Sequence, residues 1–381
     1  MIIKVFGHKR VPSREGGIEV VVGELSARMA ALGHQVTCYN RSGCHDGGVK
    51  PSAEEKLEGV TCKSVLTLNK KGLAAVTSSI SAAICCVFGK ADVVHIHAEG
   101  PAFMCWLPKL FGKRVVVTVH GLDWQREKWR SGFGAKYIRA GEKMAVRYAD
   151  EIIVLSRNVQ QYFETAYGRK TVYIPNGVLR PELVPAEQIT KNYGLQKDEY
   201  ILYLGRLVPE KGAHYLIEAF KKTDIPKKLV IAGGISDTAD YAQRLQKLAQ
   251  GDDRIVFTGF VQGRLLQELY SNAWIFAQPS DLEGMPLTLL EAMSYSNCCL
   301  VSDIPECTEV VESCAATFRK GDVESLRRAL EELWGDPDRV AALKASAAEF
   351  ICHKYDWDQV TEKTLSLYGV KQDDPRSAVC Q

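Results

Sequence analysis

Short runs of β-branched residues alternate with longer helical patterns through most of this chain, and this alternation constrains the fold most strongly. It predicts parallel sheets built from β-α-β units. The first series of predicted strands is IIKVF (2–6), QVTCY (35–39), DVVHIH (92–97), RVVVTVH (114–120), EIIVLS (151–156) and TVYIP (171–175). The second series is YILYLG (200–205), KLVIAG (228–233), RIVFTG (254–259), WIFAQPS (274–280) and CCLVS (298–302). Six strands followed by five indicate an α/β fold with two Rossmann-like, doubly wound sheets.

The chain has 381 residues, more than one hydrophobic core usually serves, which favours two domains. Asn-Gly and two prolines interrupt any regular pattern near residues 177–198, so we expect a linker or a domain boundary there. The predicted domains are residues 1–180 and 181–355, with a C-terminal helix (356–381) joining the first. Ligands in such folds bind beyond the carboxyl ends of the strands, so a central cleft that both domains face is the expected site.

The composition is that of a soluble globular protein, with 46% hydrophobic and 25% charged residues. The N-terminus lacks the apolar core of a secretion signal, and the longest apolar stretch (73–89) is shorter than a bilayer span requires. We therefore expect a cytoplasmic protein in which this stretch is a packed helix. Four of the twelve cysteines lie in apolar runs, which predicts buried, reduced thiols at Cys85, Cys86, Cys298 and Cys299.

The net charge of +2 conceals an asymmetry between the two halves. Residues 1–180 hold 26 Lys and Arg against 15 Asp and Glu, or +11, and the remainder holds 22 against 31, or −9. A basic first half suits an anionic membrane surface, an anionic acceptor or a nucleic acid, with charge matching between domains as the alternative. Aromatic residues are interspersed among cations after Asp123, as at a membrane interface or on a solvated helix face: Trp124, Arg126, Lys128, Trp129, Arg130, Lys136, Tyr137, Arg139, Lys143 and Arg147.

Two features of the first half are candidates for ligand contacts. Gly16 and Gly17 precede a helical pattern, where helix N–H groups favour phosphate oxygens, although a structural turn is the simpler explanation. Their spacing does not match the dinucleotide fingerprint. His120 ends a buried strand, so its imidazole is expected at the carboxyl end of that strand, with a structural role as the alternative. His95 and His97 share one strand face, but no third metal ligand is evident.

In the second half, Arg206 and Lys211 lie on the loop after the strand YILYLG. An Arg fork and a Lys point charge suit a diphosphate whose oxygens gain charge as a leaving group departs.

The segment SDLEGMPLTLLEAM holds two glutamates eight residues apart. Pro286 suits the first turn of a helix, so Glu283 is predicted on the preceding loop and Glu291 on the helix. The backbone N–H groups of residues 284–288 have no partner within such a helix and can bind phosphate.

Taken together, these residues resemble the family 4 glycosyltransferases, the retaining, nucleotide-sugar-dependent group with the GT-B fold. EGMPLTLLE matches the E-x7-E motif of the family, GRLVPEKG its diphosphate loop, VHG its strand-end histidine and IPNGV its interdomain passage. The resemblance covers nearly the whole chain. VPSREGGIEVVVGELSARMAALGHQVTCYNR and GLDWQREKW are also similar to a bacterial subgroup that assembles surface polysaccharides and includes rhamnosyltransferases.

The resemblance implies roles for the motif residues. Glu283 and His120 would contact the transferred sugar as catalytic residues, Glu291 would bind the ribose, and Arg206 and Lys211 would hold the diphosphate. The full donor-binding set would be Gly16, Gly17, Arg206, Lys211, Gly284, Met285, Pro286, Leu287, Thr288 and Glu291. The first domain would bind the acceptor and the second the nucleotide sugar.

The implied activity is transfer of a hexosyl group from a nucleotide-diphosphate sugar to a lipid-linked saccharide or polysaccharide, in surface glycan synthesis at the inner face of the plasma membrane. No cofactor, metal or nucleic acid is implied, and the two D-x-D matches (336–338 and 356–358) fall in the predicted C-terminal helical part. Two alternatives are a nucleotide-sugar epimerase of the same architecture and a non-catalytic sugar or nucleic-acid binder.

Overall fold

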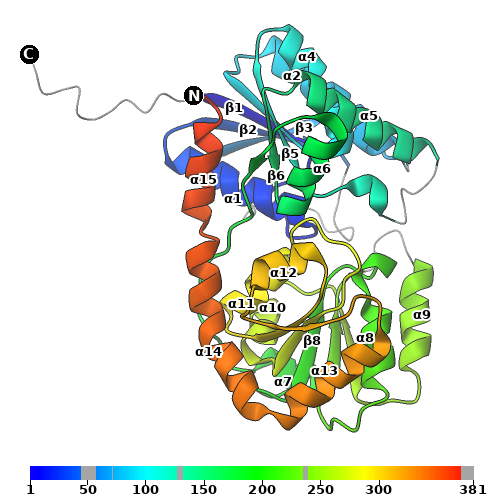
Figure 1. Ribbon diagram of the computed structural model, residues 1–381. Coiled ribbons are helices and arrows are strands. Elements are labelled where there is room, and N and C mark those ends of the chain that lie inside the picture. Colours follow the sequence, from blue (N-terminus) through cyan, green and yellow to red (C-terminus); the bar gives the residue numbers. More distant parts are fainter. Residues whose placement is uncertain (44–56, 71, 127–131, 235–238, 370–381) are drawn as a thin grey trace, which may run out of the picture. The chain divides into compact units, whose positions relative to one another are not determined.

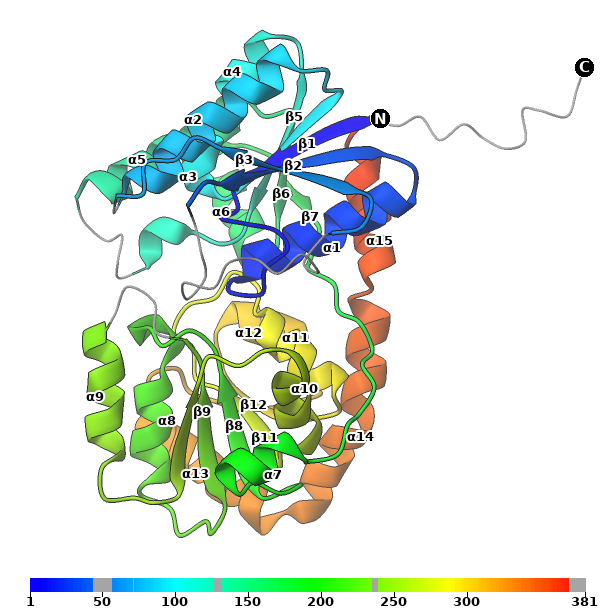
Figure 2. The ribbon, with the colours of Figure 1, turned by 180° about the vertical axis from the view of Figure 1, so that it is seen from behind.

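The computed structural model describes residues 1–43, 57–70, 72–126, 132–234 and 239–369. Lys128, Trp129, Arg130 and the end of the predicted C-terminal helix (370–381) lie outside these ranges. The chain divides into two compact units: unit 1 is Met1–Asn176 with Trp357–Gln381, and unit 2 is Gly177–Asp356. Each unit is a parallel sheet with helices on both faces (Figures 1 and 2).

The sheet of unit 1 has the strand order β3-β2-β1-β4-β5-β6-β7, and every neighbouring pair is parallel. Its strands are β1 (Ile2–Phe6), β2 (Gln35–Arg41), β3 (Val60–Val65), β4 (Val93–His97), β5 (Arg114–Val119), β6 (Glu151–Val154) and β7 (Val172–Tyr173). Central strand β4 is buried at all five positions, as expected for a strand covered on both faces.

The helices of unit 1 divide between the two faces of the sheet (Figures 1 and 2). They are α1 (Gly17–Ala31), α2 (Leu73–Phe88), α3 (Glu99–Ala102), α4 (Trp106–Leu110), the 3-10 turn η2 (Asp123–Gln125), α5 (Phe133–Tyr148), α6 (Arg157–Tyr167) and α15 (Trp357–Ser366). α1 packs against α15 on one face, and α2 to α6 cover the other. The C-terminal helix therefore belongs to unit 1.

Helix α2 is the apolar stretch identified in the sequence, and it is buried on one side only. Ala82, Ala83 and Cys86 are fully buried against the sheet, because small side chains let the helix approach closely. Cys85 was predicted to be buried and is exposed, since it lies on the outer side of the helix, whereas the other three cysteines are buried as predicted. No helix among the described residues is long and apolar enough to cross a bilayer.

The sheet of unit 2 has the order β10-β9-β8-β11-β12-β13 and is also parallel. Its strands are β8 (Tyr200–Leu204), β9 (Lys228–Ala232), β10 (Ile255–Gly259), β11 (Ile275–Gln278), β12 (Cys298–Ser302) and β13 (Ala316–Phe318). Its helices are α7 (Gln188–Tyr193), η4 (Pro209–Lys211), α8 (Ala213–Phe220), α9 (Ala239–Ala249), α10 (Gly263–Asn272), α11 (Leu287–Ser294), α12 (Pro305–Val311), α13 (Val323–Gly335) and α14 (Pro337–Lys354).

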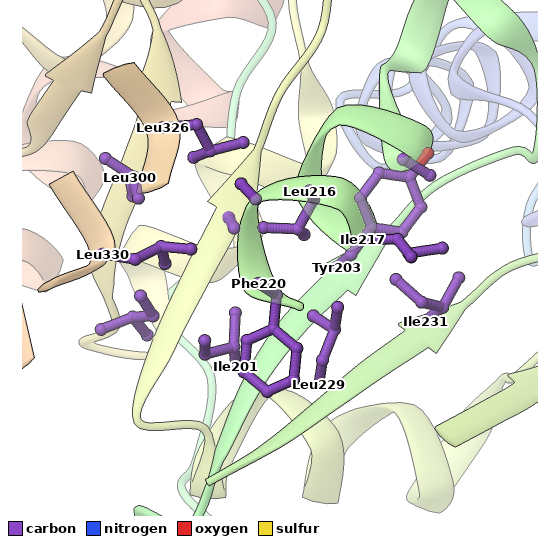
Figure 3. Packing of buried hydrophobic residues seen from close by; sticks show 14 of the residues in the cluster. Ile201, Tyr203, Leu216, Ile217, Phe220, Leu229, Ile231, Leu300, Leu326 and Leu330 are labelled. Carbon is purple, nitrogen blue, oxygen red and sulfur yellow. The ribbon is translucent and has the colours of Figure 1, made fainter. Parts of the chain in front are cut away.

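The core of unit 2 lies between its sheet and helices α8, α9 and α13. Figure 3 shows Ile201 and Leu229 from neighbouring strands packing with Leu216 and Phe220 of α8, while Leu330 comes from α13. All five side chains are fully buried. On the other face, α14 packs against α11.

Two strands were missed in the sequence, so the described sheets have seven and six strands instead of six and five. β3 is exposed at four consecutive positions and therefore lacks the continuous apolar run of an inner strand. β13 has only three residues. Both lie at sheet edges, where pairing with one neighbour needs little apolar sequence.

The predicted linker (177–198) is not irregular throughout, because it contains α7. The carboxylate Oε2 of Glu268 accepts hydrogen bonds from the backbone N–H groups of Glu187 (3.0 Å) and Ile189 (3.1 Å) at the start of this helix. A side chain some eighty residues away thus caps the helix. Local sequence patterns carry no signal for such a cap.

Candidate functional site

Two loops at the carboxyl edge of the unit 2 sheet are joined closely. Gly212 follows η4 with φ of 70°, and a Cβ atom at this position would lie 1.9 Å from the carbonyl oxygen of Pro279. The backbone N–H of Asp281 donates to the Glu210 carbonyl over 2.9 Å. Glycine is required at this contact by both space and φ, and the contact places Lys211 against the loop after β11.

Glu283 is buried in that loop and fully engaged. Its Oε1 accepts hydrogen bonds from Gln278 Nε2 (2.8 Å) and Ser280 Oγ (2.7 Å), and Lys211 Nζ lies 2.5 Å from both carboxylate oxygens. Burial by itself would raise the pKa of Glu283, but the charge of Lys211 and the hydrogen bonds outweigh it and hold this pKa below its usual value. Glu283 is therefore an ionised carboxylate at neutral pH.

Arg206 lies directly beyond β8 and Gly205, with an exposed side chain. The loops after β8 and β9 also approach closely, since a Cβ at Gly233 would lie 1.9 Å from the Gly205 carbonyl oxygen. Arg206 and Lys211 thus both lie at the carboxyl edge, as their sequence positions suggested, but Lys211 is already paired with a buried carboxylate.

Helix α11 carries the second glutamate of the motif. Glu291 is its fifth residue, and Oε2 of that side chain accepts a hydrogen bond from the Tyr270 hydroxyl over 3.1 Å. Thr288 Oγ1 donates to Gln278 Oε1 (3.3 Å), so Gln278 links the helix start to Glu283. Pro286 is the N-cap and makes no side-chain cap bond. Of the remaining predicted positions, two are buried and one is half-buried: Gly284, Met285 and Leu287.

The start of α11 therefore separates the two glutamates as predicted, with Glu283 on the preceding loop and Glu291 on the helix. Gln278 and Ser280 were missed as site residues. The available signal was their position at the end of a buried strand, where polar side chains reach the carboxyl edge of the sheet.

At the carboxyl edge of unit 1, His120 follows β5 and is buried. Its Nε2 lies 2.9 Å from Nδ1 of His97, at hydrogen-bond distance. Burial lowers the pKa of His120 to about 3, with a smaller contribution from the charge of Arg126. Burial likewise holds the pKa of His97 well below its usual value. The pair is therefore neutral at neutral pH, and one ring must donate its proton to the other.

His95, the other histidine of the strand-face pair, has different partners. Its Nδ1 lies 2.6 Å from the Tyr368 hydroxyl and its Nε2 lies 2.7 Å from Thr118 Oγ1. Burial lowers the pKa of His95 to about 3. Within the described parts of the chain, no group of three or more His, Cys, Asp or Glu side chains is arranged to hold a metal ion.

The loop after β1 also reaches this edge. Gly7 has φ of 113°, and a Cβ there would lie 2.0 Å from the His97 carbonyl oxygen. His8 Nε2 lies 2.9 Å from Asn40 Oδ1, and burial lowers the pKa of His8 to about 4. His8 and His97 were not assigned roles from the sequence, because the contact of His97 with His120 and the position of His8 near His97 depend on the order of the strands in the sheet.

Gly16 and Gly17 open α1, with Gly16 as an N-cap that makes no side-chain cap bond. Glu19 turns back here, and its Oε1 accepts a hydrogen bond from the Lys9 backbone N–H over 2.8 Å. A Cβ at Gly16 would lie 2.3 Å from Glu19 Oε2, so this glycine leaves room for the carboxylate. Gly17 is exposed at the first helical position.

A second buried cluster supports the segment after His120. Glu142 of α5 accepts hydrogen bonds from Trp124 Nε1 (3.3 Å), from the Tyr162 hydroxyl (2.9 Å) and from Tyr167. Burial, together with a hydrogen bond to Glu142, raises the pKa of Glu99 well above its usual value. Trp124 is thus anchored at its indole nitrogen and is not part of a freely solvated basic face.

Both D-x-D matches have structural explanations. Asp336 caps α14 by accepting a hydrogen bond from the Arg339 backbone N–H (2.9 Å), and Asp338 lies in the first turn of that helix. Asp358 lies in the first turn of α15 and pairs with Arg28 over 2.9 Å.

Two family models match the chain, one in each half. The model described as Glycosyltransferase Family 4 matches residues 15–179, and the model described as Glycosyl transferases group 1 matches residues 186–350. Alpha-maltose-1-phosphate synthase of Mycolicibacterium smegmatis is 25% identical over 386 residues, covering 94% of this chain and 96% of that protein. O-antigen chain mannosyltransferase RfbU of Salmonella typhimurium is 26% identical, covering 59% and 61% of the two chains.

Solved structures with the same architecture cover nearly all of this chain. Sucrose-phosphate synthase from Thermosynechococcus elongatus superposes with a TM-score of 0.81 at 20% identity, covering 97% of this chain and 98% of that one. Anabaena Alr3699/HepE in complex with UDP-glucose gives 0.79 at 16% identity, covering 97% and 100%. The two parallel-sheet, Rossmann-like units are therefore those of the GT-B fold.

Proposed function

Because this chain belongs to the glycosyltransferases that combine a family 4 domain with a group 1 domain, we propose that it transfers a hexosyl group from a nucleotide-diphosphate sugar to a lipid-linked saccharide or polysaccharide, with retention of configuration. Unit 2 would bind the donor and unit 1 the acceptor. The observation that carries this proposal is the contact between Lys211 and buried Glu283, beside exposed Arg206 at one sheet edge.

The charges at this edge suit a departing nucleotide diphosphate. Negative charge accumulates on the diphosphate oxygens as the sugar leaves, and preorganised cations stabilise it. Arg206 supplies a planar fork and Lys211 a point charge already fixed in position by Glu283. A cation fixed before the donor binds needs little reorganisation during the reaction.

The two glutamates do not suit a glycosidase-like acid and nucleophile pair. Such a scheme needs one carboxyl group that is protonated and a second that is free to attack or to activate water. Glu283 is ionised and bound on both oxygens, and Glu291 accepts from Tyr270. This arrangement favours positioning of a donor, with the departing phosphate itself as the base.

His120 would contribute a neutral hydrogen-bonding group from unit 1. Its ring is uncharged at neutral pH and held by His97, so it can orient a sugar or acceptor hydroxyl without adding a positive charge. Gly16 and Gly17 would bring the start of α1 close to the diphosphate.

The choice of a lipid-linked acceptor rests on two supports. One relative is an O-antigen chain mannosyltransferase, and another is described as a phosphatidylinositol monomannoside mannosyltransferase of Mycobacterium tuberculosis. The excess of 26 basic over 15 acidic residues in residues 1–180 favours contact with an anionic surface. We also propose that the reaction takes place at the cytoplasmic face of a membrane and that the chain belongs to the subgroup that includes rhamnosyltransferases.

A donor screen tests the function. UDP-, dTDP- and GDP-sugars are compared for thermal stabilisation, since a ligand at 100 times its dissociation constant adds about 2.7 kcal/mol to the free energy of unfolding. With the stabilising donor, Arg206→Ala should lower kcat/KM by about 10²–10³-fold, because it removes a donor to the charge that develops in the transition state. Arg328→Ala is the matched control, an exposed arginine on α13.

The outcomes separate the candidate activities. Equal kcat/KM in the two arginine variants would remove Arg206 from the site. Solvent-proton exchange into the nucleotide sugar without an acceptor would identify an epimerase. Sugar binding that persists in Glu283→Gln and Arg206→Ala, with no nucleotide release, would identify a non-catalytic binder.

A further inference from the structure

Exposed apolar side chains are concentrated on one part of unit 1. Among the described residues, nine large apolar side chains of this unit are exposed, and only Leu32 lies apart from the other eight in the chain. The eight come from the segment after β3, from α2 and from the end of α4. They are Leu66, Leu68, Leu73, Ile80, Ile84, Phe88, Leu110 and Phe111, and we call them the α2 face.

The members of the α2 face are neighbours in the fold. Residues 73, 80, 84 and 88 follow helical spacing and form one stripe along α2. Ser81 Oγ donates to the Leu66 carbonyl (3.0 Å), and the Leu68 backbone N–H donates to Thr77 Oγ1 (3.0 Å). α4 packs directly against α2 (Figures 1 and 2), and exposed Leu110 and Phe111 lie at the end of α4.

Within residues 60–90, the segment that holds β3 and α2, the charged side chains have one sign, whereas exposed Glu58 and Asp92 lie just outside it. Residues 60–90 contain four lysines and no aspartate or glutamate. Of these lysines, Lys63, Lys70 and Lys90 are exposed. Lys109 on α4 is paired with Asp150 and adds little charge to this side. The result is an exposed apolar stripe along a helix, with lysines before and after it in the chain.

We propose that the α2 face docks unit 1 on an anionic lipid bilayer, an inference that rests on the proposed transfer to a lipid-linked acceptor. Apolar side chains would enter the boundary between head groups and acyl chains, while the lysines would contact lipid phosphates. The charge argues for lipid over a second copy of the chain, because a twofold contact through this surface would bring lysines toward lysines.

The position of this face relative to the strands has a consequence for the acceptor. Leu66 and Leu68 follow the carboxyl end of β3, the edge of the parallel sheet at which His120 lies, and α2 then runs back toward the opposite edge. A lipid-linked saccharide embedded beside the α2 face would therefore reach the carboxyl edge of the sheet, where His120 lies, from the end of the α2 face that carries Leu66. The same surface would hold the enzyme and present its acceptor.

Vesicle binding tests the proposal. The full chain is mixed with phosphatidylcholine vesicles containing about one third phosphatidylglycerol, and with pure phosphatidylcholine vesicles, and binding is measured by flotation. Ile84→Glu and Phe88→Glu should each weaken binding to the anionic vesicles about tenfold or more, because each places a charge where an apolar side chain enters the bilayer. Lys63→Gln and Lys70→Gln should each weaken it about fivefold and reduce its salt dependence.

Leu32→Glu is the matched control, since Leu32 is 59% exposed in the same unit but outside the α2 face, and it should bind vesicles like the wild type. Nucleotide-sugar stabilisation, measured on every variant, reports folding and the donor site independently. Loss of vesicle binding with retained donor stabilisation supports the proposal. Equal vesicle binding by Phe88→Glu and Leu32→Glu would overturn the proposal. It would also be overturned if the wild type bound no vesicles and instead formed a dimer that Phe88→Glu dissociates. Neither result would affect the assignment of the donor site.

Discussion

The carboxyl edges of the two sheets bury their polar groups in different ways. At the carboxyl edge of unit 1, His8, His97 and His120 lie buried and uncharged, as does His95 inside β4, because burial lowers the pKa of each. At the edge of unit 2, Glu283 is equally buried and stays charged, because Lys211 compensates its burial. Burial alone does not determine protonation, and the identity of the neighbour decides whether the edge offers a charge or a neutral hydrogen bond.

The difference predicts that acid destabilises unit 1 before unit 2. A histidine with a folded pKa of about 3 to 4 and an ordinary value of 6.5 contributes stability that is complete above pH 6.5 and is lost as the pH falls toward the folded value. The slope is about 1.4 kcal/mol per pH unit for each such histidine, so the loss reaches several kcal/mol by about pH 5. Unit 2 has one comparable histidine, His214, with a pKa of about 4.

The contribution of Glu283 to stability is lost at lower pH than that of the histidines. Its folded pKa is below the usual 4.5, so its contribution is complete above pH 4.5 and is lost below that. Urea titrations at stepped pH, with proteolytic fragments identifying which unit has unfolded, measure the two windows. Unfolding of unit 2 first, or of both units together near pH 4, would contradict the comparison.

Lys211→Met should leave the buried charge of Glu283 at the unit 2 edge without its partner cation. Removing one partner of a buried ion pair costs about 3–5 kcal/mol, because the remaining charge is left buried. The free energy of unfolding should fall by this amount at pH 7, and the deficit should shrink as acid neutralises Glu283. Urea titration at both pH values measures this, and adding Glu283→Gln should restore part of the stability. A deficit that does not depend on pH would show that the charge of Glu283 is not its cause.

Of these changes, His97→Phe should have the smallest effect, and it should act by changing the orientation of the His120 ring. The ring keeps its approximate volume, but the hydrogen bond to His120 Nε2 is lost. We expect kcat to fall about tenfold with KM little changed, as for a lost positioning contact. His97→Gln should recover part of the rate, and nitrogen chemical shifts of His120 should report a changed tautomer in His97→Phe only. His34→Phe is the control, and an equal loss there would remove the positioning role.

The sequence predicted the layered architecture well because buried parallel strands are continuous apolar runs. Each of the eleven predicted runs overlaps an observed strand, whereas β3 and β13 were missed at the sheet edges. The helix at 73–88 was predicted, but its one-sided burial was not, because Ala and Ser occur on both sides of it. α7 was missed because its cap comes from Glu268.

The sequence by itself determined the alternation of eleven strands with helices along the chain, the position of Glu283 on a loop and Glu291 on a helix, and the family to which the chain is similar. These follow from local periodicity and from short motifs, which need no knowledge of distant residues. Only the tertiary structure decided that Lys211 forms an ion pair with Glu283, that His97 contacts His120, and that eight apolar side chains of unit 1 are exposed. Each of these depends on residues far apart in the chain that sheet order and helix packing bring together, and a pKa or an exposed surface is a property of those neighbours.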